Sequence, residues 1–111
     1  MKPDRELERL KGLLMRSESF SHTFNLVRRI VGIFIDHDDR EAEKVLADLL
    51  DCGNEGIQFL ALCALWDAEN RGKLLDWKTQ VKLFQFRNNP INERLCDMVS
   101  HSLKAEKAPF N

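Results

Sequence analysis

Apolar residues recur at every third or fourth position through six segments of the chain, and short polar turns separate these segments. This spacing places the apolar side chains on one face of an α-helix. It therefore predicts an all-α fold of about six helices. The predicted helices are residues 3–16, a second helix capped by Ser19 or Ser21, residues 39–52, a fourth helix between Asn54 and Gly72, a fifth from Asp76 through Arg87, and a sixth from Pro90 to about Lys104. Because the connections are short, successive helices are expected to pack antiparallel or at a steep angle, as three hairpins.

The turn residues and the apolar faces give more detailed expectations. We expect Asp38 to cap the third helix, with Glu41 in the capping-box position, and Gly53 to end it in the left-handed conformation. The residues expected to face inward are Leu7, Leu10 and Leu14; Phe24, Val27, Ile30, Val31 and Phe34; Ala42, Val45, Leu46 and Leu49; Ile57, Leu60, Ala61, Ala64 and Leu65; Trp77, Val81 and Phe84; and Ile91, Leu95, Met98 and Val99.

Length and composition predict one folded domain. A chain of 111 residues with 43% hydrophobic and 32% charged residues can form one core, and is too apolar for a disordered segment. We expect a single all-helical domain over residues 1–106 and a frayed tail over 107–111. The longest apolar run, residues 30–35, is too short to span a bilayer, so no membrane association is expected. The three cysteines are widely spaced and predict reduced thiols in a cytoplasmic protein.

Charge is distributed unevenly along the chain, although the net charge is only −1. Residues 1–35 carry seven basic and four acidic side chains, residues 36–69 carry two and ten, and residues 70–111 carry eight and four. An acidic middle between basic ends can steer a charged partner or favour a homo-oligomer, because such fields act at a distance. The alternative is a set of solvated helix faces.

A weak internal repeat with a period of about 34 residues relates the fourth and sixth helices. Ile57, Ala61 and Leu65 fall on Ile91, Leu95 and Val99, so these positions stay apolar. The period is that of a helix–turn–helix unit. The tetratricopeptide repeat has the same period, but its Trp/Leu/Gly/Tyr/Ala signature is missing here.

The segment 57–65, IQFLALCAL, resembles the second helix of a HEAT or armadillo-like repeat. Ile57, Ala61, Ala64 and Leu65 match the family's pattern, whereas Gln58 stands where an Arg is usual. The resemblance is best over residues 54–66. It implies three antiparallel hairpins in a right-handed HEAT-like stack that binds a protein partner through one face. A compact helical bundle is the alternative architecture, because any set of similar amphipathic helices shows such a period.

No motif predicts catalysis, a cofactor or a metal site. The acidic turn around His37 fails the EF-hand pattern, since Arg40, Glu41 and Ala47 would stand at loop positions 5, 6 and 12. The sequence His101-Ser102-Leu103-Lys104 resembles the H-x-L-K core of histidine phosphotransfer domains, but the residues that follow it differ from that family. The predicted catalytic, cofactor-binding and metal-binding sets are therefore empty, and phosphotransfer on His101 remains the weakest alternative.

Aromatic and basic side chains provide the candidate partner-binding residues, which are Phe59, Trp66, Trp77, Lys78, Lys82 and Arg87. The leading prediction is a small non-catalytic helical-repeat module, a scaffold or adaptor, that mediates protein–protein interaction. The alternative is a nucleic-acid-associated module, because cations with interleaved aromatics can contact phosphates and stack on bases. Six of the eight cations of that basic C-terminal third lie among or near the aromatics: Arg71, Lys73, Lys78, Lys82, Arg87 and Arg94.

Overall fold

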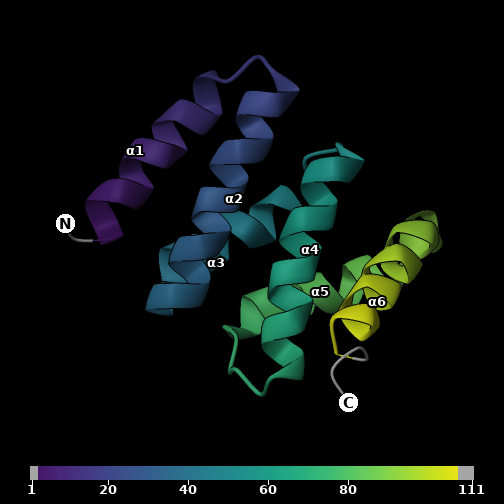
Figure 1. The fold of residues 1–111 in the computed structure, drawn as a ribbon. Helices are drawn as coiled ribbons and strands as arrows, with labels where there is room; N and C mark the ends of the chain where they lie inside the picture. The colour runs from purple at the N-terminus through teal and green to yellow at the C-terminus, as the bar shows by residue number, and fades with distance from the viewer. Residues whose placement is uncertain (1–2, 108–111) are drawn as a thin grey trace.

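The computed structural model describes residues 3–107, which form six α-helices, a 3-10 turn and no strand (Figure 1). The predicted all-α class is confirmed. The helices are α1 (Pro3–Arg16), α2 (Phe20–His37), α3 (Arg40–Leu49), α4 (Glu55–Asn70), α5 (Trp77–Arg87) and α6 (Glu93–Lys107), with the 3-10 turn η1 (Pro90–Asn92) before α6. The predicted tail began at residue 107, but α6 includes Lys107, and residues 108–111 lie outside the described part.

From α1 to α5, neighbouring helices in the sequence are also neighbours in space. The antiparallel helices α1 and α2 pack together, and α3 packs on α4 (Figure 1). Between these pairs, α2 contacts α4, α4 contacts α6 and α3 contacts α5. The helices α5 and α6 are joined through η1, which contacts both. With extents of 36 × 29 × 28 Å, the fold is compact, and α4 lies at its centre.

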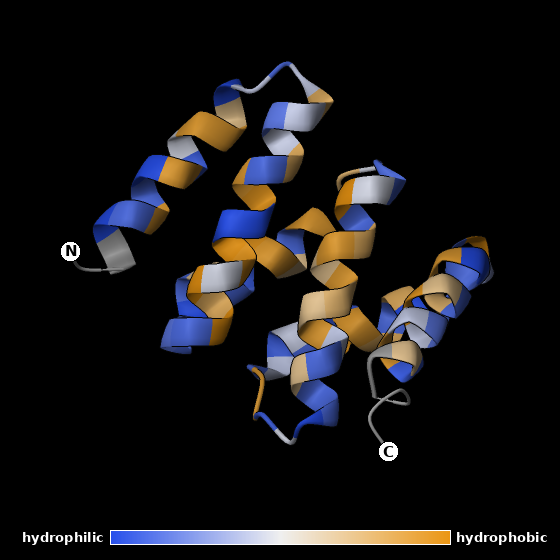
Figure 2. Ribbon diagram, in the orientation of Figure 1, coloured by the Kyte–Doolittle hydropathy of each residue, from blue (hydrophilic) through white to orange (hydrophobic). Residues whose placement is uncertain are grey.

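Figure 2 shows hydrophobic residues along the facing sides of α1 and α2 and over much of α4. The core draws on every helix, with Leu10, Ile30, Leu46, Leu65 and Val99 completely buried. The central position of α4 explains its composition: a helix covered by four neighbours needs apolar residues on most of its surface.

Most of the predicted helix ends are confirmed. Ser19 caps α2 and Asn54 caps α4 through their side-chain oxygens, and Gly53 and Gly72 adopt positive φ angles of 79° and 87°. The predicted third helix, residues 39–52, is shorter: α3 ends at Leu49. The next three backbone N–H groups bond three residues back, which tightens the chain into a turn.

The prediction that Asp38 caps the third helix is wrong. The cap of α3 is Asp39, whose carboxylate accepts hydrogen bonds from the backbone N–H groups of Glu41 and Ala42 at 2.8 and 3.0 Å. Because α2 continues to His37, the left-handed residue that turns the chain falls on Asp38, with φ of 53°. Asp39 is then left in the extended conformation that a cap requires.

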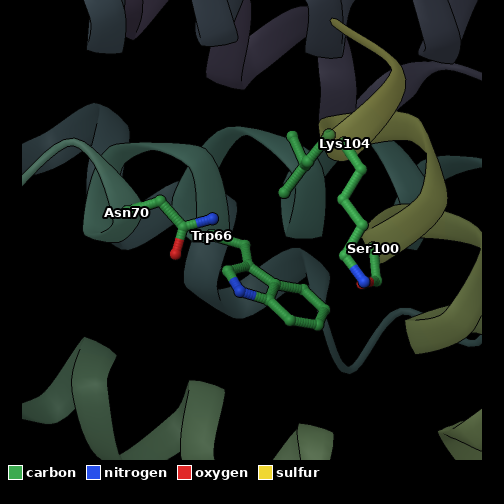
Figure 3. A pocket seen from close by; sticks show the side chains of 5 residues that line it. Trp66, Asn70, Ser100 and Lys104 are labelled. Atoms are coloured by element: carbon green, nitrogen blue, oxygen red, sulfur yellow. The ribbon is translucent and has the colours of Figure 1, made fainter. Parts of the chain in front are cut away.

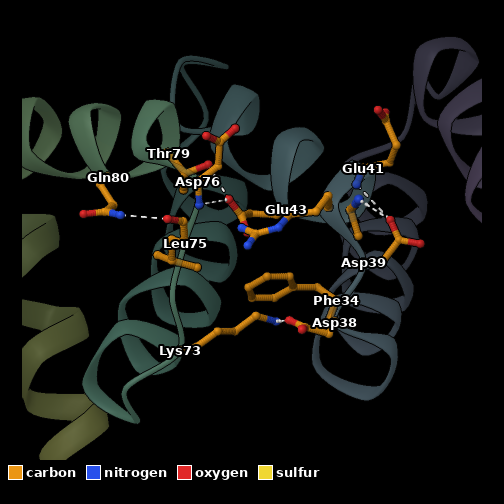
Figure 4. A network of polar contacts seen from close by, with 12 residues as sticks. Phe34, Asp38, Asp39, Glu41, Glu43, Lys73, Leu75, Asp76, Thr79 and Gln80 are labelled. Carbon is orange, nitrogen blue, oxygen red and sulfur yellow. Dashed lines mark hydrogen bonds and ion pairs between the residues drawn. The ribbon is translucent and has the colours of Figure 1, made fainter.

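The N-terminus of α5 is capped from another helix. Asp76 occupies the predicted cap position, but its side chain makes no capping hydrogen bond. Instead, Glu43 of α3, only 1% exposed, accepts hydrogen bonds through Oε2 from the backbone N–H of Asp76 at 2.9 Å and from Thr79 Oγ1 at 2.7 Å (Figure 4). Its other oxygen lies 3.0 Å from Arg40 Nη1. A buried carboxylate thus satisfies one backbone donor and one side-chain hydroxyl at the positive end of α5.

The predicted inner face of α5 is wrong. Trp77, Val81 and Phe84 are exposed, and the buried residues of α5 are Thr79, Leu83 and Phe86. Both sets recur at i, i+4 and i+7, and each residue of the second set follows one of the first by two positions. Two positions correspond to roughly half a helical turn, so the two sets lie on opposite sides of the helix. The hydrogen bond between Thr79 and Glu43 fixes the rotation of α5 about its axis and turns the more apolar stripe outward.

Two inner positions predicted for the sixth helix are also wrong. Ile91 is 87% exposed because it lies in the 3-10 turn, before α6 begins, and Met98 is 45% exposed. The predicted residues Leu95 and Val99 are buried, and Cys96 and Leu103 complete the inner face of α6.

The role of Glu43 predicts a large effect of a nearly isosteric change. Replacing Glu43 with Gln removes the charge that holds three donors, and we expect the free energy of unfolding to fall by about 2–3 kcal/mol. The exposed neighbour Glu41 provides the control, and Glu41→Gln is expected to change stability by less than about 0.5 kcal/mol. Urea denaturation measures both. Equal effects of the two substitutions would contradict the proposed cap.

Candidate functional site

The most exposed continuous apolar feature of α5 is its outer face. Leu74, Trp77, Val81 and Phe84, hereafter the α5 stripe, are 76%, 67%, 40% and 64% exposed. The last three lie at i, i+4 and i+7 on α5, and Leu74 precedes the helix by three positions. Single exposed apolar residues are ordinary, but an aligned set that includes two aromatic rings is typical of an interaction surface.

A hollow lies beside one end of the α5 stripe. It has a volume of about 520 Å³ and is open to solvent. Leu74, Leu75 and Trp77 form its apolar lining, and its polar lining consists of Arg40 of α3, Asp76 and Gln80 of α5. The hollow exists because the segment that enters α5 is held against α3 by the Glu43 hydrogen bonds.

The flanks of the α5 stripe carry cations and amides. No acidic residue occurs in α5, whose charged residues are Lys78, Lys82 and Arg87. Lys82 Nζ lies 2.9 Å from Asp51 Oδ2 and 3.2 Å from Asp48 Oδ1. These two carboxylates raise the pKa of Lys82 above its usual value, the hydrogen bond to Asp51 having the largest effect. Lys78 is exposed and has no ion-pair partner among residues 5–105.

The segregated charge of the sequence is largely paired within the fold. Lys73 forms an ion pair with Asp38, Arg87 pairs with Glu69 at 2.8 Å, and Lys11 of α1 pairs with Glu41 at 3.7 Å. The Lys73 ammonium also lies 3.9 Å from the centre of the Phe34 ring (Figure 4). Its hydrogen bond to Asp38 lowers the pKa of that carboxyl. The acidic middle third is therefore paired with the basic ends of the same chain.

The predicted residues Phe59 and Trp66 are half-buried and pack against the core. The guanidinium of Arg87 lies 5.1 Å from the centre of the Trp66 ring while it pairs with Glu69. Trp66 also borders a small pocket of about 80 Å³ between α4 and α6, which it lines with Asn70, Ser100, Leu103 and Lys104 (Figure 3). This second face of α4 is thus covered by packing.

The six predicted partner-binding residues consequently do not form one surface. Trp77 and Lys78 lie on the exposed side of α5, Lys82 and Arg87 are held in ion pairs, and Phe59 and Trp66 pack inside. The apolar periodicity assigns Val81 and Phe84 to the core and so misses them as surface residues. The sequence feature that could have identified them is that α5 carries two apolar stripes, because only one of these can face the core of a small domain and the other must be exposed.

Other possible sites have few features that indicate chemistry. Within residues 5–105, no group of three or more His, Cys, Asp or Glu side chains could hold a metal ion. His101 is exposed and borders an open groove along α6 with Ile91, Arg94 and Met98. Cys96 is buried, and burial raises the pKa of its thiol. No helix in the described part has the length and apolar character needed to cross a bilayer.

Comparison of the chain with protein-family models, with curated proteins and with solved structures found no match.

The rotation of α5 can be tested with two phenylalanines that are two positions apart. Phe86 is 7% exposed and Phe84 is 64% exposed. We expect Phe86→Ala to lower the free energy of unfolding by about 3–5 kcal/mol, because it leaves a cavity in the core. Phe84→Ala is expected to change it by less than about 0.5 kcal/mol. Chemical denaturation of dilute protein measures both. A larger loss of stability for Phe84→Ala than for Phe86→Ala would mean that the face predicted from the sequence, with Phe84 inward, is the buried one.

The ion pair between Lys73 and Asp38 predicts a pH-dependent effect of Asp38→Asn. Asparagine tolerates the left-handed backbone, so the substitution chiefly removes the charge. Because the pKa of Asp38 in the folded state lies below the usual 3.8, its ionised form stabilises the fold above that value. We expect the variant to be less stable near neutrality, and the difference to vanish as pH falls through the folded-state pKa.

Urea denaturation between about pH 7 and pH 3 measures this difference. Asp36→Asn is the control, since Asp36 is exposed and forms no ion pair among the described residues. A difference for Asp38→Asn that stays constant down to the acid limit would contradict the prediction.

Proposed function

We propose that this chain is a small non-catalytic helical module, of the scaffold or adaptor type, that binds a protein through the α5 stripe. The observation that carries the proposal is the exposure of Trp77 and Phe84 on the side of α5 opposite its buried face. Exposed aromatic rings in register on a rigid helix are the usual anchors of protein–protein interfaces.

Energetics support a binding role for this stripe. A fully buried aromatic side chain removes about 150–250 Å² from water, so the exposed parts of the two rings amount to roughly 250–300 Å². Leu74 and Val81 extend this area. Nothing in the packing requires these rings to be apolar, since the stability of α5 comes from Leu83, Phe86 and the Glu43 cap.

The order of helix contacts supports the proposed HEAT-like character. Contacts of α2 with α4, of α4 with α6 and of α3 with α5 are those expected for stacked hairpins. We propose on this basis that the module belongs to the HEAT or armadillo-like class. The wide spacing of its three cysteines in the sequence supports the proposed cytoplasmic location.

The nucleic-acid alternative has less support. Of the eight cations in the basic C-terminal third, Arg71, Lys73, Lys82 and Arg87 are held in ion pairs with Asp67, Asp38, Asp48 and Asp51, and Glu69. Within residues 5–105, Lys78, Arg94 and Lys104 remain for phosphate contacts, whereas affinity for a nucleic acid rises with the number of phosphates neutralised.

The proposal is tested by photo-crosslinking in cells. A photoreactive benzoylphenylalanine at position 77 or 84 is expected to give a defined protein adduct. The same group at position 15 is not, because the exposed Met15 lies on α1. The complex reconstituted from purified components should be lost in Trp77→Ser/Phe84→Ser and retained in Met15→Ser. Binding that survives the double substitution would overturn the proposal.

A further inference from the structure

We propose that the occupant of the α5 stripe is the α5 stripe of a second copy of this chain, in an antiparallel pair related by a twofold axis. The inference rests on the proposed function and names the partner for the same surface. A twofold interface requires one patch to be complementary to itself. The α5 stripe meets this requirement in shape, charge and area.

The shape argument begins with the spacing of a ring and a hollow on one helix. The Phe84 side chain, which is 64% exposed, projects from one end of the stripe. The hollow bordered by Leu74 and Trp77 lies at the other end. Seven residues separate Phe84 from Trp77, a rise of about 10 Å along the helix. In an antiparallel pair centred near Val81, Phe84 of each copy therefore meets Trp77 and the hollow of the other. Each copy supplies one projection and one recess.

The charge argument favours a partner of low net charge. On the flanks of the stripe, Lys82 is paired with Asp48 and Asp51, and Arg87 is paired with Glu69. Arg40, beside the hollow, is paired with Glu43. Asp76, which also lines the hollow, and Lys78 carry opposite charges, and neither forms an ion pair among residues 5–105. An acidic or a basic partner helix would therefore find few free counter-charges, whereas two copies of a patch of low net charge approach without strong repulsion.

Lys78, the cation of α5 that has no ion-pair partner within residues 5–105, fits the same arrangement. Lys78 and Gln85 lie on the same flank of the helix, seven positions apart. In the antiparallel pair, Lys78 of one copy lies opposite the flank that carries Gln85 of the other. The two Lys78 side chains are then at opposite ends of the interface, and a neutral amide faces each of them.

The area argument places the pair among weak dimers. Four side chains that are 40–76% exposed offer roughly 400–500 Å² of apolar surface per copy. Two copies together bury close to the roughly 1,000 Å² at which specific interfaces begin. We therefore expect a reversible dimer with a dissociation constant of about 10–100 µM.

Sedimentation equilibrium of the full chain tests this inference. The expected result is a monomer–dimer equilibrium that Phe84→Glu weakens by about thirtyfold or more, because it places a charge in the hollow of the other copy. Met15→Glu, at the 88% exposed position on α1, is the matched control and should dimerise as the unchanged chain does. Should Phe84→Glu unfold, Trp77→Lys replaces it, and circular dichroism verifies folding. A monomer at all concentrations up to about 0.5 mM, or a dimer that Phe84→Glu leaves intact, overturns the inference.

Two further measurements define the geometry. In a Cys52→Ser background, which removes the exposed native thiol, Val81→Cys is expected to form a disulfide between copies on mild oxidation, because position 81 lies near the twofold axis. Lys44→Cys, exposed on α3, is the control and should stay reduced. Dimerisation is expected to be unchanged or slightly stronger between about 0.05 and 0.5 M salt, since no ion pair crosses the proposed interface. A steep loss of affinity with salt, or a Val81→Cys variant that stays reduced at dimer-forming concentrations, contradicts the antiparallel α5 pair.

These results also separate this inference from the proposed function. If the chain stays monomeric while a photo-crosslinker at position 77 captures a different protein in a complex that Trp77→Ser/Phe84→Ser abolishes, the second copy is refuted and the protein-binding function stands. If neither the dimer nor such a complex forms, both proposals fail.

Discussion

The buried carboxylate of Glu43 determines which face of α5 is exposed to solvent. It is a charged group 1% exposed, and a buried charge is tolerated only when its hydrogen bonds are satisfied. Its donors come from the backbone at the start of α5, from Thr79 one turn later, and from Arg40 on its own helix. These bonds attach α5 to α3 and specify one rotation of α5. Any other rotation would take Thr79 away from the carboxylate and bury a different stripe.

That rotation has a consequence for surface chemistry. With Thr79, Leu83 and Phe86 inside, Trp77 and Phe84 must lie outside. The ion pairs act in the same direction, because they place the cations of the C-terminal third on carboxylates of α4 and of α3 and the turn that follows it. The outer side of α5 is therefore both apolar and nearly neutral. Hydrophobic contact, and not long-range attraction, is the force available to a partner at this surface.

The sequence predicted the local features well, because these depend on near neighbours in the chain. Helix periodicity, the caps at Ser19 and Asn54, and the left-handed conformation of Gly53 are all confirmed. The candidate site was harder to predict. Trp77, Val81 and Phe84 form a more apolar stripe than Thr79, Leu83 and Phe86, so periodicity alone assigns the wrong face to the core. The deciding contact joins residues 36 positions apart, and Glu43 is one of ten acids in its third of the sequence.

The outer surfaces of α1 and α5 differ in a way that bears on assembly. The outward residues of α1 include exposed charged side chains, Arg5, Glu8 and Arg9, as a terminal polar face requires. In contrast, α5 presents Trp77 and Phe84 to solvent. A module with a polar α1 surface and an apolar α5 surface cannot extend through both surfaces by the same kind of contact. It can close on itself by pairing two α5 surfaces, and a closed pair leaves the polar α1 faces outward, where they oppose further association.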